Sequence, residues 1–134
     1  MRTQYNPKQS PRIIIIQKLY GKFFNEDEDL IFSKHRFKKF IKDVVLGTIE
    51  RDEIIKEELK NHLSEDLTLE NLDKVFQVII KSAIFEMLYK PKTSINIIIK
   101  EYLNASNFFL EKSQSKYLNA LLDKIGKKIR NSNE

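Results

Sequence analysis

The stretch LDKVFQVIIKSAIFEML, from Leu72 to Leu88, decides the fold of this chain. Its apolar residues recur with the spacing i, i+3, i+4, i+7 and i+8, which places them on one wide face of an α-helix. Val78 and Phe85 lie off that face, so the helix is apolar on more than one side. The pattern predicts a central helix in an all-α domain. Pro91 lacks an N–H and disfavours helical geometry at Lys90, so the helix should end there.

The composition is that of one helical globular domain spanning residues 1–134. The chain is 41% hydrophobic and 32% charged, with only three Gly and three Pro, which argues against disorder. It has no Cys, which excludes disulfides, zinc bound by cysteine and a thiol nucleophile. The longest aliphatic run is four residues, Ile13 to Ile16, and the first twelve residues are polar. We therefore expect no membrane span, no signal peptide and a cytoplasmic protein.

The residues before the central stretch predict a helix on each side of an acidic segment. Ser10 and Pro11 suit the N-cap and first position of a helix. The four isoleucines that follow would alone suit a buried strand equally well, but the helical spacing continues beyond them. The acids at 26–29 favour a second helix start. The apolar spacing over 37–63 predicts one long helix, bent near Gly47.

Three hydroxyl side chains are placed to begin the remaining helices. Thr68 suits the N-cap of the central helix, Ser94 that of a helix reaching about Phe109, and Ser113 that of the last helix. Gly126 lies inside the last apolar stripe and is expected to weaken the end of that helix. No run has the spacing of a strand. We expect an all-α bundle of about six to seven helices.

Charge is distributed unevenly along the chain. Residues 1–24 carry a net charge of +5, residues 25–111 carry −4, and residues 112–134 carry +4. If the two ends meet in the fold, they form one cationic patch suited to phosphates. The alternative is that the lysines are merely solvated.

Four segments, taken in order, resemble one known family. They are SPRIIIIQKLY (10–20), IIKSAIFEML (79–88), IIIKEYLNASNFF (97–109) and KYLNALLDK (116–124). The first is similar to the opening helix of the NusB family of bacterial transcription antitermination factors, which ends V-Q-A-L-Y. The last resembles the K-F-V-N-G-V-L-D signature of that family. The usual N-terminal arginine cluster is reduced here to Lys8 and Arg12.

The resemblance implies both a fold and a function. The fold would be two small helical bundles around the central helix. The function would be binding of boxA-type single-stranded RNA together with NusE, a small-subunit ribosomal protein. That pair joins RNA polymerase complexes that resist termination on ribosomal RNA operons. Neither a cofactor nor a metal is implied.

Six residues are candidates for RNA contact. Residues 1–10 are expected to form a flexible basic arm. Lys8 in this arm, and Arg12 and Lys18 in the helix that follows it, could contact phosphates or could belong to a solvated helix face. Tyr20 could stack on a splayed base, although an aromatic in an apolar stripe is usually core. Ser115 and Lys116 lie at the start of the last helix, where backbone N–H groups favour anions.

Glu86, Tyr89 and Glu101 are candidates for the surface that binds the protein partner, because the middle of the chain is acidic and NusE-type partners are basic. A solvated face is the alternative for these residues. His35 and His62 lack further ligands at metal-binding spacing, so no metal site is expected. No catalytic motif is found, and we expect no enzyme.

Three alternatives stay open at this level. The chain could be a protein–protein adaptor whose basic ends bind an acidic partner. It could be related to the NusB-like domain of ribosomal RNA cytosine methyltransferases, although no catalytic domain follows Lys124 in this sequence. It could also form a homodimer.

Overall fold

The computed structural model describes residues 10–27, 29–63 and 68–131. Within these ranges the chain is all-α, as predicted, and contains no strand. It forms six α-helices and one short 3₁₀ helix, labelled η2. Their bounds are α1 Pro11–Phe24, α2 Lys38–Glu50, α3 Asp52–Lys60, η2 Leu69–Asn71, α4 Lys74–Tyr89, α5 Ile95–Ser106 and α6 Lys112–Asn131.

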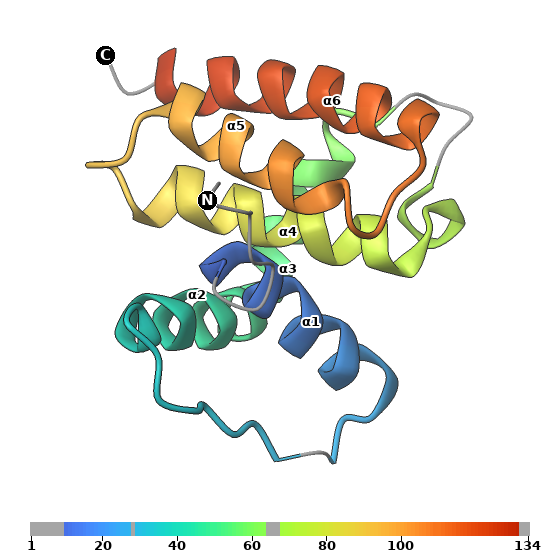
Figure 1. Cartoon of the computed structure of the whole chain (residues 1–134). Coiled ribbons are helices and arrows are strands. Elements are labelled where there is room, and N and C mark those ends of the chain that lie inside the picture. Colours follow the sequence, from blue (N-terminus) through green and yellow to red (C-terminus); the bar gives the residue numbers. More distant parts are fainter. Residues whose placement is uncertain (1–9, 28, 64–67, 132–134) are drawn as a thin grey trace, which may run out of the picture.

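Helix α4 is the central helix, as the apolar pattern predicted. It packs against all five other α-helices. Figure 1 shows α5 and α6 on one side of α4, α1 and α2 on the other, and α3 passing behind α4, which agrees with the expected two small bundles around the central helix. Every residue from Phe76 to Met87 is buried, because neighbours cover this helix on several sides. None of the described helices is both long and apolar enough to cross a membrane.

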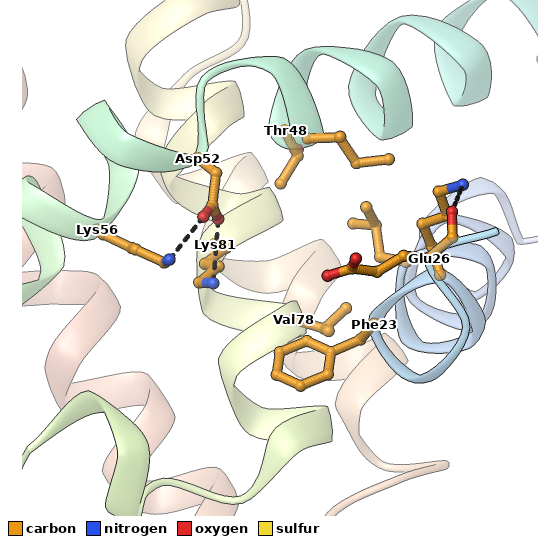
Figure 2. A pocket seen from close by; sticks show the side chains of 10 residues that line it. Phe23, Glu26, Thr48, Asp52, Lys56, Val78 and Lys81 are labelled. Carbon is orange, nitrogen blue, oxygen red and sulfur yellow. Dashed lines mark hydrogen bonds and ion pairs between the residues drawn. The ribbon is translucent and has the colours of Figure 1, made fainter.

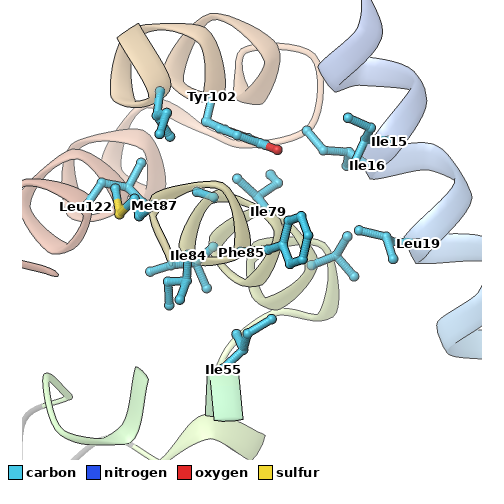
Figure 3. Close-up of a cluster of buried hydrophobic side chains, with 14 of the residues drawn as sticks. Ile15, Ile16, Leu19, Ile55, Ile79, Ile84, Phe85, Met87, Tyr102 and Leu122 are labelled. Atoms are coloured by element: carbon cyan, nitrogen blue, oxygen red, sulfur yellow. The ribbon is translucent and has the colours of Figure 1, made fainter. Parts of the chain in front are cut away.

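The core is continuous through α4. Ile15, Ile16 and Leu19 of α1 point toward it from one side (Figure 3). Leu122 of α6 lies beside Met87 on the other side. Each fully buried aliphatic side chain contributes about 1.5–3 kcal/mol relative to exposure. The four consecutive isoleucines lie within α1, so the alternative that they form a buried strand is wrong.

The acidic segment at 26–29 does not begin a helix. Glu26 and Asp27 form a turn, and residues 29–35 have no regular secondary structure. Adjacent carboxylates repel one another, and only Leu30 and Phe32 among the next residues pack against the core. The chain just after this segment is held by the Lys18 ammonium, which donates to the carbonyl of Ile31 at 2.5 Å. The apolar residues that follow the acids do not recur at helical spacing. The helix expected to begin at 26–29 is therefore absent from the described residues.

The expected long helix is two helices, divided at Arg51 rather than bent at Gly47. Arg51 ends α2 and precedes α3, with φ −105° and ψ 26°. The division turns α3 so that Ile55 and Leu59 are fully buried, although most of α3 is charged. Gly47 stays inside α2, where it allows close contact: a Cβ there would lie 2.3 Å from the ring of Phe85.

Helix starts agree with the sequence in some places only. Ser94 caps α5 as predicted, with its hydroxyl accepting from the N–H of Ile97 at 3.2 Å. Thr68 precedes η2 instead of α4, whose N-cap is Asp73. Helix α6 begins at Lys112, one residue before the predicted cap Ser113.

Candidate nucleic-acid interface

Arg12 lies inside the protein, in a bidentate pair with Glu86. Its Nη2 is 2.6 Å from Glu86 Oε1, and its Nε donates to Oε2 at 3.1 Å. The hydroxyl of Tyr102 donates to the same Oε2 at 2.5 Å. Glu101, which is partly exposed, lies 3.6 Å from Arg12 Nη1. The Glu86 side chain is 0% exposed, so the cluster joins α1 to α4 and α5 away from water.

Electrostatics keep the Arg12 guanidinium charged. Burial alone lowers the pKa of the Arg12 guanidinium, but hydrogen bonding and attraction to Glu86 raise that pKa above its usual value. Burial and the adjacent Glu86 carboxylate raise the pKa of Tyr102 well above its usual value. The Tyr102 hydroxyl therefore keeps its proton and remains a donor.

The expected surface position of Arg12 and Glu86 is wrong. A buried charge needs a partner, and each of these residues supplies the other. The helical pattern contained the signal: Ile15, Ile16 and Leu19 follow Arg12 at i+3, i+4 and i+7, which places Arg12 in the middle of the buried face. In this arrangement Arg12 fixes the start of α1 and does not offer its guanidinium to solvent.

Lys18 and Tyr20 lie on different sides of α1. They are two residues apart, which is about 200° around a helix. Lys18 points to the irregular segment before α2, where its Nζ is 5.4 Å from the centre of the Phe32 ring. Tyr20 is 39% exposed and meets Phe24 edge-on at 4.8 Å. Lys8 lies outside the described residues.

The start of α6 packs against the start of α4. Gln114 donates to Asp73 at 3.1 Å, and the Tyr117 ring stacks on Phe76 at 5.6 Å. Burial raises the pKa of Tyr117. One face of Tyr117 is thus covered by the protein. Lys116 is exposed and Ser115 is half-buried.

The structure brings the tyrosine of α1 and the start of α6 to the same end of the molecule. Helix α1 is antiparallel to α4, because Arg12 meets Glu86 near the end of α4 while Lys74, at its start, lies 4.8 Å from the Phe23 ring. The turn between α5 and α6 reaches this end too, with Phe108 50% exposed (Figure 1). We call this surface the aromatic end. Its members are Tyr20, Phe24, Phe108, Ser115 and Lys116.

The three candidate partner residues do not form one exposed surface. Glu86 is buried, as described above. Tyr89 is 37% exposed at the end of α4, with the Arg51 guanidinium 4.5 Å from its ring centre. Glu101 is 41% exposed and faces Arg12. Tyr89 and Glu101 are therefore accessible, and both lie away from the aromatic end.

A cavity of about 430 Å³ lies between α1, α2, α3 and α4 and contains compensated charges. Asp52 lies 2.8 Å from Lys56 and 3.1 Å from Lys81 (Figure 2). Burial alone raises the pKa of Asp52, but the two lysines lower it overall. Among the described residues, no group of three or more His, Cys, Asp or Glu is placed to hold a metal.

Counting net charge over long segments of the sequence missed one group of cations. Residues 34–42 carry five cations and no acid, within a middle region whose net charge is negative. All five cations are exposed. A shorter window along the sequence would have found this run. Its cations are Lys34, Arg36, Lys38, Lys39 and Lys42.

Comparison with known proteins agrees with this arrangement of helices. The model of the NusB family matches residues 9–127, nearly the whole chain. The chain belongs to the NusB family. The transcription antitermination protein NusB of Novosphingobium aromaticivorans is 26% identical over 95% of this chain and 86% of that protein. For the first curated relatives that it matches, the chain spans less than two thirds of their length.

Solved NusB structures share the fold of this NusB-family protein. T. maritima NusB superposes with a TM-score of 0.79 at 22% identity, covering 92% of this chain and 93% of that one. A crystal structure of the antitermination factors NusB and NusE in complex with dsRNA matches with a TM-score of 0.76 at 13% identity. That match covers 93% of this chain and 99% of the other.

Proposed function

We propose that this protein is an RNA-binding transcription antitermination factor that binds boxA-type RNA together with NusE. The observation that carries the proposal is the match of the family model to residues 9–127. The fold likeness to a NusB seen with NusE and dsRNA supports the same assignment. The protein would act without catalysis, in the cytoplasm, as part of an RNA polymerase antitermination complex.

The aromatic end is the proposed RNA surface. Single-stranded RNA is commonly bound by stacking unpaired bases on exposed aromatic rings and by cations that contact phosphates. Tyr20, Phe24 and Phe108 are exposed rings, and Lys116 is an exposed cation at the start of α6. The first N–H groups of α6 add a favourable site for a phosphate. Arg12 contributes indirectly, because its pair with Glu86 fixes α1 and hence Tyr20.

The test is fluorescence anisotropy with a boxA RNA, a scrambled RNA of equal length and a duplex of the boxA sequence, each with and without NusE. We expect preference for single-stranded boxA RNA, strengthened by NusE. Lys116→Gln should weaken binding and reduce the salt slope by about 0.7, the value for one lost phosphate contact on a single strand. Equal, weak binding to every RNA in both conditions would refute the proposal.

Lys127→Gln is the matched control. Lys127 lies on the same helix as Lys116, toward its other end, and its side chain is 69% exposed. It pairs with Asp123 at 3.1 Å, so its charge is already compensated. Both substitutions remove one charge, and only Lys116→Gln should change RNA binding. Sedimentation of the same samples decides whether a homodimer forms and covers the aromatic end.

A further inference from the structure

The run of cations at residues 34–42 lies on a surface that the proposed RNA site does not use. Five cations and one histidine occur among nine residues, in the turn before α2 and its first turns. Figure 1 shows the segment joining α1 to α2 on the side of the molecule away from α6. Lys18 faces the same segment from α1, about 200° around that helix from Tyr20. This surface and the aromatic end are therefore distinct.

A cavity of about 240 Å³ lies under these cations. Its cationic lining comes from Lys18, Lys34 and Lys38, with His35 beside them, and among the residues that the structure describes no carboxylate lines it. Ile14, Phe32 and Ile41 form its apolar wall. The volume is several times the roughly 30 Å³ that one water occupies in the liquid, so a phosphate group with its hydration fits inside.

What distinguishes this run is that five cations lie within nine residues without an acid among them; some cations elsewhere in the protein are paired with acids, and others, such as Lys116, are single exposed charges. Lys56 and Lys81 share Asp52, Lys90 pairs with Asp43, and Lys128 lies 3.4 Å from Glu58. Within the described ranges, none of the five cations at 34–42, nor Lys18, lies within ion-pair distance of a carboxylate. Uncompensated like charges at close range repel one another, and a bound polyanion removes that repulsion.

An exposed aromatic ring lies within the same run. Phe37 is 43% exposed, the Arg36 guanidinium lies 5.3 Å from its ring centre, and the His35 ring lies 6.0 Å away. A ring flanked by cations stacks on nucleic-acid bases irrespective of their sequence. This feature favours a nucleic acid over an acidic protein, whose carboxylates would need only the cations.

We infer that residues 34–42 and Lys18 form a second nucleic-acid site, which binds the sugar-phosphate backbone of RNA flanking the specific sequence. A phosphate occupies the cavity between Lys18, Lys34 and Lys38, and a base stacks on Phe37. The site adds affinity and salt dependence without sequence preference. The inference rests on the proposed RNA-binding function for the identity of the polyanion.

The test compares two RNAs by anisotropy over a series of salt concentrations. One is the short boxA RNA, and the other is the same RNA extended on both sides by arbitrary sequence. The unmodified protein should bind the extended RNA more tightly and with a steeper salt slope. Lys34→Gln/Lys38→Gln/Lys39→Gln should lose this advantage, with a slope smaller by about 2 for three phosphate contacts. Lowering the salt concentration from about 200 mM to about 50 mM should therefore widen the difference in affinity between the unmodified protein and this variant roughly fifteenfold.

Lys92→Gln/Lys100→Gln/Lys124→Gln is the matched control, because it removes the same charge from exposed lysines elsewhere. If both triple variants bind the extended RNA alike, the inference is overturned. It is also overturned if poly-glutamate of equal charge competes as well as RNA, or if inorganic phosphate alone at millimolar concentration abolishes the advantage. A separate result would show that the proposed function is wrong. In that case the unmodified protein would not prefer short boxA RNA over scrambled RNA.

Discussion

At the scale of single residues, the buried pair of Arg12 and Glu86 is the most demanding feature of the core. Two charges leave water there, and both must be satisfied by the surrounding protein. The bidentate geometry and the Tyr102 hydroxyl supply the required partners. The pair fixes α1 on α4 at one definite register, which apolar contacts alone would specify less sharply.

Glu86→Gln should destabilise the protein by about 3–5 kcal/mol, because it leaves the Arg12 charge buried without its main counter-charge. Urea unfolding followed by circular dichroism measures the loss. Glu101→Gln is the control: its carboxylate also faces Arg12 but is partly exposed, and its removal should cost less than about 1 kcal/mol. Equal losses for the two substitutions would contradict the assigned role of Glu86.

The sequence predicted the exposure of some candidate residues and not of others. Arg12 was expected to contact phosphates and Glu86 to contact the protein partner, and either role would place the side chain at the surface. Their burial depends on each other, and no window of sequence relates positions 74 residues apart. Tyr20 and Lys116 were expected at the surface and are accessible. The cations at 34–42 were visible in the sequence but were averaged with nearby acids.

At the scale of elements, α2 and α4 approach closely because Gly47 has no side chain. A Cβ at this position would lie 2.3 Å from ring carbons of Phe85, which is 5% exposed. The contact brings α2 against the central helix, with the fully buried Val44 and Val45 on its inner face.

Gly47→Ala should destabilise the protein by about 1–3 kcal/mol through this overlap, although alanine is the better helix former. Gly21→Ala is the matched control. Gly21 also lies inside a helix, and because alanine is the better helix former this change should stabilise by up to about 1 kcal/mol. Thermal unfolding of the two variants should therefore shift in opposite directions. A rise in melting temperature for both would mean that Phe85 moves aside freely.

Helices with a continuous apolar pattern were predictable, and the connections between them were not. The end of α4 before Pro91 and the cap of α5 follow from residues at or next to the element itself. The division at Arg51 depends on where Ile55 and Leu59 must lie to reach α4, which is a tertiary requirement. The acids at 26–29 carry a local helix-start signal, but the apolar residues that follow them are consecutive and do not form one face of a helix.

At the scale of the whole molecule, α4 belongs to both bundles. The helices on its two sides share one core, so neither bundle can bury its apolar surface without it. This arrangement predicts one cooperative unit despite the appearance of two halves.

Urea unfolding should accordingly give a single transition, as expected for a two-state domain of this size. Far-ultraviolet circular dichroism reports the helices, and the fluorescence of the five tyrosines reports packing without interference, because the chain has no Trp. The two signals should have the same midpoint. An early fluorescence change that leaves part of the helical signal intact would show that one bundle unfolds separately.

The buried pair also limits how this protein can change over evolutionary time. Replacing either Arg12 or Glu86 alone leaves the other charge unpaired inside the core. Each single substitution therefore gives a poorly stable protein. A neutral pair of similar volume would be tolerated, but reaching it requires two substitutions together. Among descendants of this sequence, the two positions should therefore be inherited as a unit, kept together or exchanged together.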